Sequence, residues 1–175
     1  MKNYLYVLII LLVNINLIAQ DKMTTVDSVD LKKYTGTWYE IAKIPNRFQD
    51  HCIKNATASY TIDEDGDIIV HNKCIDEDGE LDDAEGLARV VDKETNSKLE
   101  VSFVSFLGWR PFWGDYWILG LESNYQYVVI GTPSREFGWI LCRTPQMSEA
   151  DLENCYKIFE KNGYDRKSFE LSKQD

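Results

Sequence analysis

The sequence has few basic residues, prolines and glycines, and each shortage excludes a class of protein. Lys and Arg number 19 against 29 Asp and Glu, so the formal net charge is −10. Most of such a surface repels a phosphate backbone, and we expect no nucleic-acid partner. Only 4 Pro and 10 Gly occur in 175 residues, which argues against extensive disorder and for one globular domain.

Histidines are also scarce, since only His51 and His71 are present, and no Gly-x-Ser-x-Gly motif accompanies them. The sequence therefore does not support a hydrolase that uses a serine nucleophile with a histidine base. A zinc site made of both histidines with Cys52 and Cys74 requires four ligands on one hairpin. Along a strand, residues 51 and 52 point to opposite faces, and so do residues 71 and 74. We therefore expect neither a metal nor a cofactor.

Long apolar runs are absent except near the start of the chain. Lys2 precedes an apolar run over residues 4–13, and Asn14 and Asn16 interrupt it before the small-residue exit at Ala19. This pattern predicts a signal peptide over residues 1–20 rather than a membrane anchor. No Cys follows Ala19, so we expect no lipid attachment. The mature protein, with a polar leader over 21–30 and a domain over 31–175, is expected in the periplasm or outside the cell.

Export favours disulfides, and the four cysteines allow three pairings. Cys52 and Cys74 flank an acidic turn at similar distances, as residues on the two strands of a hairpin do. Cys142 lies near the end of a late strand, and Cys155 lies on the segment that follows it. We favour the pairs Cys52–Cys74 and Cys142–Cys155, while the other pairings and free thiols remain open.

Strand-like runs, separated by turn residues about every ten positions, make up most of the chain. They cover residues 37–44, 52–62, 67–75, 84–91, 98–105, 116–122, 126–131 and 137–143. Short and long connections alternate, and 45–51, 76–83, 106–115 and 132–136 are the long ones. Eight strands at this spacing predict an all-β sandwich or barrel over 36–144, and an up-and-down antiparallel order places the long loops at one end. Alternation places Leu99, Val101 and Phe103 on one strand face.

One strong helix signal follows the strands. Ser148 is a suitable N-cap, and Asn162-Gly163 provides a stop, so we expect a helix over 149–161. Its apolar stripe includes Cys155 and Phe159, which indicates packing against the outside of the sheet. The tail over 166–171 is expected to form a short ninth strand.

The segment 106–113 is unusually aromatic for a loop, with Phe106, Trp109, Phe112 and Trp113 in eight residues. An apolar loop at the open end of a barrel folds down as a lid, contacts a membrane or a partner, or lines the entrance for an apolar ligand. Arg110 in its middle is suited to meet the anionic head of a ligand.

Two motifs resemble those of the lipocalin family, in its branch of bacterial outer-membrane lipocalins and apolipoprotein D. They are Gly36-Thr37-Trp38-Tyr39-Glu40-Ile41-Ala42 and Trp139-Ile140-Leu141-Cys142-Arg143-Thr144-Pro145. The resemblance implies an eight-stranded up-and-down antiparallel lipocalin barrel with one C-terminal flanking α-helix. It also implies structural roles at the closed end, where Trp38 is the plug, Arg143 lies over its indole, and Gly36 permits the close approach.

By the same resemblance, the chain is expected to bind and to store or transport a small lipophilic ligand, a fatty acid or a lysophospholipid, without catalysis. Alternation from Trp38 places Glu40, Ala42 and Ile44 inside the barrel, with Arg89 or tyrosines as partners for the buried Glu40 carboxylate. The expected ligand contacts are Glu40, Ala42, Ile44, Val101, Phe103, Phe106, Trp109, Arg110, Phe112 and Trp113. Two alternatives remain: an enzyme that uses Glu40, and a protein-interaction module that uses loop 106–113.

Overall fold

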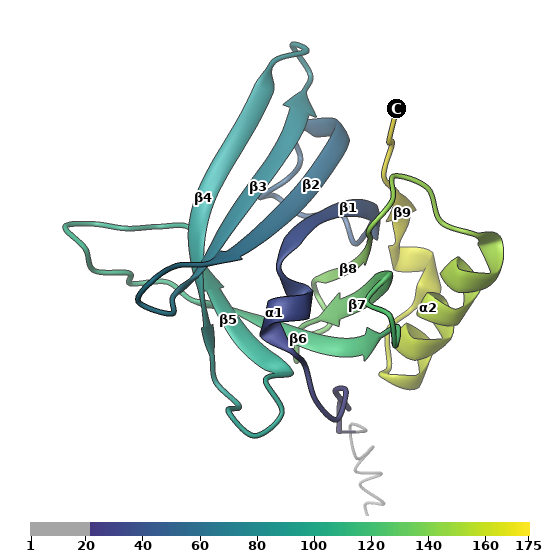
Figure 1. The fold of residues 1–175 in the computed structure, drawn as a ribbon. Helices are drawn as coiled ribbons and strands as arrows, with labels where there is room; N and C mark the ends of the chain where they lie inside the picture. Colours follow the sequence, from purple (N-terminus) through teal and green to yellow (C-terminus); the bar gives the residue numbers. More distant parts are fainter. Residues whose placement is uncertain (1–21) are drawn as a thin grey trace, which may run out of the picture.

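The computed structural model describes residues 22–175, and the predicted signal peptide lies outside this range. Eight antiparallel strands form the body of the molecule (Figure 1). They are β1 (Gly36–Lys43), β2 (Cys52–Ile62), β3 (Ile68–Asp76), β4 (Leu81–Val90), β5 (Lys98–Ser102), β6 (Gly114–Leu121), β7 (Tyr127–Gly131) and β8 (Gly138–Cys142). Each strand pairs with the next, and β1 pairs with both β2 and β8, so the sheet closes into a barrel. The predicted all-β barrel is confirmed.

The β3–β4 hairpin differs from the sequence prediction, which placed a loop over 76–83. Pairing continues through Cys74 with Asp82 and Ile75 with Leu81, so only residues 77–80 form the turn. Acidic residues on this hairpin suggested a loop, but they are compatible with strands because their side chains are exposed to water. Gly79, at a φ of 81°, supports the tight turn.

Helix α2 (Glu149–Lys161) packs on the outside of the barrel, as predicted (Figure 1). The Ser148 hydroxyl accepts a hydrogen bond from the Asp151 amide at 3.1 Å and caps the helix. The expected ninth strand over 166–171 is shorter than predicted. Asp165 accepts a hydrogen bond from the Lys167 amide and caps the 3₁₀ turn η1 (Arg166–Ser168), so only β9 (Glu170–Leu171) pairs with β1. None of the described helices is long and apolar enough to cross a membrane.

The segment expected to be a polar leader is packed against the barrel. Val29 is buried in the cluster inside the barrel, and Met23 is buried in the cluster beneath α2. The short helix α1 (Leu31–Tyr34) follows, capped by the Asp30 carboxylate. Its last residue, Tyr34, is buried at the closed end of the barrel. This part of the chain therefore helps to seal the barrel from below.

One of the two favoured disulfides is present. Cys52 and Cys74 are bonded, whereas Cys142 and Cys155 are free and buried, so the predicted Cys142–Cys155 bond is wrong. Both thiols belong to the apolar cluster between the barrel and α2, where a free cysteine behaves as a small hydrophobic residue. The pKa of the Cys155 thiol is raised to about 12, and burial is the largest cause.

Candidate ligand-binding site

The closed end of the barrel is sealed by an indole under a guanidinium. The Trp38 side chain is fully buried, and the Arg143 guanidinium carbon lies 3.7 Å from its ring centroid. Arg143 also donates hydrogen bonds to five backbone carbonyls, those of Lys33, Tyr34, Thr35, Thr37 and Tyr125. Gly36 has a φ of 96°, and a Cβ there would lie 3.3 Å from the Arg143 Nη1. The guanidinium therefore ties α1, β1 and the β6–β7 turn together.

Above this seal, three buried tyrosines form the floor of the lumen. The Tyr116 hydroxyl lies 2.6 Å from that of Tyr34 and 2.8 Å from that of Tyr60, so the three are joined by hydrogen bonds. Burial raises the pKa of Tyr60 to about 12 and the pKa values of Tyr34 and Tyr116 well above 10. The hydroxyls therefore remain protonated, and the floor carries no charge.

An inner cavity of about 100 Å³ lies against this floor, and the Glu40 carboxylate lines it. Its oxygens accept hydrogen bonds from Gln49 Nε2 at 2.8 Å and from Ser172 Oγ at 2.6 Å. The Lys43 Nζ lies 3.7 Å from Glu40 Oε1, and both side chains are buried. Glu40 is thus paired within the protein. Neither Arg89 nor a tyrosine, the partners expected from the sequence, pairs with it.

A larger cavity of about 610 Å³ opens above the inner one. Its walls come from the long loops over 44–51, 103–113 and 132–137 and from the adjoining parts of the strands β2 to β6 and β8. Both cavities share six lining residues, Gln49, Thr57, Asn72, Val101, Phe103 and Trp139. The two cavities therefore form one hollow that widens toward the open end.

Five of the ten expected ligand contacts line this hollow. Glu40 lines the inner cavity, Phe112 and Trp113 line the mouth, and Val101 and Phe103 line both. The Phe103 ring lies against the backbone of Gly86, where an added Cβ would come within 2.8 Å of it. The Phe103 ring fits at this place because Gly86 on β4 has no side chain.

The inward assignment of Ala42 and Ile44 is wrong. The pairing between β1 and β8 shifts between Glu40 and Ala42, because Ile41 is an extra residue in a β-bulge. Alternation reverses beyond the bulge, so Ala42 and Ile44 pack in the cluster beneath α2.

Phe106, Trp109 and Arg110 do not line either cavity, contrary to the sequence prediction. Phe106 and Trp109 are each 67% exposed on a loop that projects from the barrel between β5 and β6 (Figure 1). The Arg110 guanidinium donates to the Ser102 carbonyl at 2.8 Å and is therefore engaged within the loop. Trp113 is fixed on the barrel by the Arg89 guanidinium, whose carbon lies 4.1 Å from its ring centroid.

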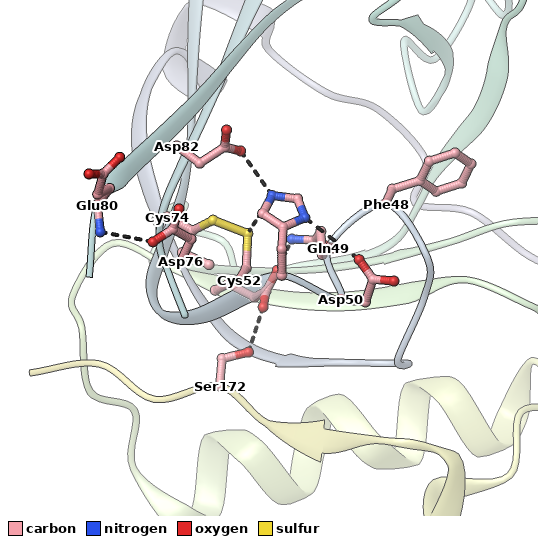
Figure 2. The surroundings of a disulfide bond; sticks show 12 residues. Phe48, Gln49, Asp50, Cys52, Cys74, Asp76, Glu80, Asp82 and Ser172 are labelled. Carbon is pink, nitrogen blue, oxygen red and sulfur yellow. Dashed lines mark hydrogen bonds and ion pairs between the residues drawn. A yellow bond between two sulfur atoms is a disulfide. The ribbon is translucent and has the colours of Figure 1, made fainter. Parts of the chain in front are cut away.

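The Cys52–Cys74 disulfide (Figure 2) lies at the rim of the mouth, and the Cys52 Sγ is 3.7 Å from the His51 Nε2. The His51 Nε2 is 2.9 Å from Asp82 Oδ2 and its Nδ1 is 3.6 Å from Asp50 Oδ1. The hydrogen bond with Asp82 is the main cause that raises the pKa of His51, and the Asp50 carboxylate raises this pKa further. The disulfide also indicates an oxidising, exported environment.

The family model described as "Lipocalin-like domain" matches residues 29–174. The chain belongs to this family. It is 39% identical over 147 residues to temperature-induced lipocalin-1 of Arabidopsis thaliana, covering 82% of this chain and 78% of the relative. It is 34% identical over 148 residues to the outer membrane lipoprotein Blc of Escherichia coli K12, covering 84% and 80%. Apolipoprotein D of Mus musculus is 35% identical over 146 residues, covering 79% and 74%.

Solved structures support the lipocalin fold. Insecticyanin from the tobacco hornworm Manduca sexta has a TM-score of 0.70 at 21% identity, covering 86% of this chain and 84% of that one. Lobster apocrustacyanin A1 has a TM-score of 0.66 at 19% identity, covering 82% and 79%. Family membership supports binding and transport of a small hydrophobic ligand, and the related lipocalins are generally binding proteins rather than enzymes.

Sequence reasoning missed several residues that line the hollow of this lipocalin, among them Thr57, Asn72, Phe137 and Trp139. Asn72 is the most informative, because its Oδ1 is buried without a hydrogen-bond partner. Strand alternation places Asn72 on the same inner face as the buried Val70 on β3. This alternation could have predicted Asn72 as a lining residue.

Proposed function

We propose that this lipocalin binds a fatty acid or a lysophospholipid in the barrel lumen and stores or transports it. The observation that carries the proposal is the mouth cavity of about 610 Å³. Small-molecule sites typically measure about 300 to 1,000 Å³. Phe103, Phe112 and Trp139 provide apolar walls. Each buried methylene of an acyl tail contributes about 0.8 kcal/mol, so tail burial supplies most of the affinity.

The charges along the hollow favour entry of the tail first. The Glu40 carboxylate that lines the inner cavity is paired with Lys43, and none of the described Lys or Arg residues lines this cavity, so an anionic head group would lose its water there without gaining a partner. Lys73 lines the mouth together with Asp82 and Asp115, and water there remains accessible to a carboxylate or phosphate. The tail therefore reaches toward the tyrosine floor, and the head group stays at the entrance.

Native mass spectrometry of the purified protein tests this proposal. We expect one co-purified lipid per chain, and we expect the delipidated protein to take up one equivalent of fatty acid or lysophospholipid in titration. A barrel that is isolated empty and takes up neither lipid contradicts the proposal.

We also propose that the protein binds its ligand without catalysing a reaction on it. An enzyme on this barrel requires an ionisable group in the lumen, and Glu40 is the candidate from the sequence. Its two oxygens already accept hydrogen bonds from Gln49 and Ser172, which leaves it poorly suited to exchange protons with a ligand. After incubation, candidate lipids are expected to be recovered unchanged, whereas turnover would favour the enzyme.

Peripheral membrane contact through the aromatic loop is a second element of the proposal. Leu107 is 91% exposed, and Phe106, Trp109 and Phe112 are each at least 67% exposed, which is unusual for large apolar side chains. The net charge of −10 favours a zwitterionic over an anionic surface. Phosphatidylcholine vesicles are expected to retain the protein in flotation and to lose a Leu107→Ser, Trp109→Ser double variant. Equal retention of both proteins contradicts this contact.

We also propose that the protein is exported to the periplasm or the extracellular space without a lipid anchor. The signal-like residues 1–20 and the Cys52–Cys74 disulfide support this location. Cell fractionation with intact mass analysis tests it, because an anchored protein would carry the added mass of its acyl chains.

A further inference from the structure

The rim of the mouth brings three metal-ligating side chains together, those of His51, Cys52 and Cys74, and Asp82 lies beside His51. We infer that reduction of the Cys52–Cys74 disulfide converts the rim into a zinc site formed by His51, Cys52, Cys74 and Asp82. This inference is independent of the proposed lipid ligand. It rests on the positions of these four side chains, all of which line the mouth cavity.

The topology explains why these side chains lie close together. The strands β2, β3 and β4 are neighbours, and Cys74 and Asp82 are directly paired across β3 and β4, so their side chains share one face. The disulfide places Cys52 on the same face.

The position of His51 overturns the sequence argument against convergence on this hairpin. His51 precedes β2 and lies in a turn in which the Cys52 amide donates to the Gln49 carbonyl at 3.2 Å. Strand alternation therefore does not apply between residues 51 and 52. His71, the other histidine considered, lies apart and pairs with Asp83 at 2.9 Å.

The ligand atoms are near enough to form a zinc site once reduction lets the two bonded sulfurs move apart. Ligand atoms of His51, Cys52 and Cys74 all lie within 4.8 Å of one another, and His51 Nε2 is 3.7 Å from Cys52 Sγ. Zinc bonds of about 2.0 to 2.3 Å place neighbouring ligand atoms roughly 3.3 to 3.8 Å apart. Asp82 Oδ2 lies 2.9 Å from His51 Nε2 but outside this group of three, so its carboxylate has to turn toward the sulfurs to become the fourth ligand.

The surroundings provide access and orientation. The side chains of His51 and Asp82 are 42% and 49% exposed, so an ion reaches them from solvent. Asp50 Oδ1 lies 3.6 Å from His51 Nδ1, the nitrogen that is not a ligand. A carboxylate at this nitrogen orients the ring and makes it a better donor to a metal.

The chemistry is conditional on a reductant, which we take to be a dithiol. The dithiol gives two electrons and two protons to the Cys52–Cys74 bond and becomes a disulfide, leaving two cysteine thiols. Zinc then displaces both thiol protons and binds the thiolates. Two sulfurs, one imidazole and one carboxylate form a set that suits zinc better than calcium or magnesium.

Cobalt titration of the purified protein tests the inference, with a phosphine as reductant because it adds no thiols. The reduced protein is expected to bind one equivalent of Co²⁺ with thiolate charge-transfer bands and the strong visible bands of a tetrahedral site. Zinc should abolish these bands. The oxidised protein should show none, and it controls for the free thiols of Cys142 and Cys155. A reduced protein without these bands overturns the inference.

Matched histidine variants then identify the ligands. His51→Ala is expected to weaken cobalt binding by more than about tenfold, since even residues that only orient a ligand are worth that much. His71→Ala should have no effect, because its ring forms an equivalent pair with Asp83 away from the sulfurs. Both variants keep all four cysteines, and circular dichroism confirms that the barrel is folded. Equal cobalt affinities for the two variants overturn the assignment.

Discussion

At the closed end of the barrel, Trp38 is fully buried under the Arg143 guanidinium, whereas Phe112 at the open end is 70% exposed beside a cavity of about 610 Å³. Polar groups at the closed end bind each other, as the five carbonyls around Arg143 and the three joined tyrosines do. At the open end, Asn72 Oδ1 has no partner. The closed end is therefore organised for stability, and the open end retains space and unpaired groups for a ligand.

The largest expected effect is on stability at the closed end. Trp38→Ala should lower the free energy of unfolding by about 3 to 5 kcal/mol, because it leaves a cavity and removes the surface on which Arg143 stacks. Urea denaturation measures this loss. Trp109→Ala is the control at the other end, and its 67% exposed side chain predicts a change within about 0.5 kcal/mol. Equal losses would contradict the division between the two ends.

The open end depends on a covalent bond where the closed end depends on packing. Cys52 and Cys74 are 22 residues apart, so reduction is expected to cost about 3 kcal/mol of unfolding free energy. Urea denaturation with and without a phosphine measures it. Denatured, unreduced protein should also show two reactive thiols, those of Cys142 and Cys155. If no reactive thiol is detected, Cys142 and Cys155 form the second disulfide after all.

Filling the mouth should affect ligand uptake and leave stability nearly unchanged. Ala84 is exposed and lines the mouth cavity, so Ala84→Trp is expected to weaken lipid binding by more than about tenfold, or 1.4 kcal/mol. Its neighbour Glu85 is exposed on the opposite face of β4, and Glu85→Trp is the matched control. Titration of both delipidated variants with the same fatty acid gives the comparison. If Ala84→Trp binds as tightly as Glu85→Trp, the ligand does not occupy the mouth.

The sequence was most informative about the closed end. Trp38, Arg143 and Gly36 lie in motifs whose roles the family resemblance implied. Local periodicity predicted the strands, and the same resemblance implied their closure into a barrel. At the open end, single insertions and side-chain partners decide the outcome. The bulge at Ile41 reversed the faces of Ala42 and Ile44, and no local pattern signals an extra residue opposite a distant strand.

Arg110 shows the same limitation for charged groups. An arginine in an apolar loop indicates a ligand contact when only the sequence is considered, but its guanidinium donates to the carbonyl of Ser102, eight residues earlier. Likewise, the partners of Glu40 include Ser172, which is 132 residues away. The first pairing depends on how the loop between β5 and β6 folds back, and the second depends on the path of the C-terminal tail. Neither is encoded in local periodicity.

The smallest expected effect is a pH-dependent contribution of His51 at the rim. The hydrogen bond with Asp82 raises the pKa of His51 in the folded state above the unfolded value of about 6.5, and the nearby Asp50 carboxylate raises it further. The contribution to stability is therefore fully present below about pH 6.5 and is lost as the pH rises through the folded pKa.

Because the ring is 42% exposed, solvent screening limits this contribution to about 0.5 kcal/mol. Asp82→Asn removes the charged partner and should lower the urea midpoint at mildly acidic pH but not at alkaline pH. The same loss at both pH values would show that Asp82 stabilises the β3–β4 hairpin independently of the His51 charge. In that case the charge of His51 does not contribute to the stability of the rim, and the contrast between the two ends rests on the cavity and the disulfide.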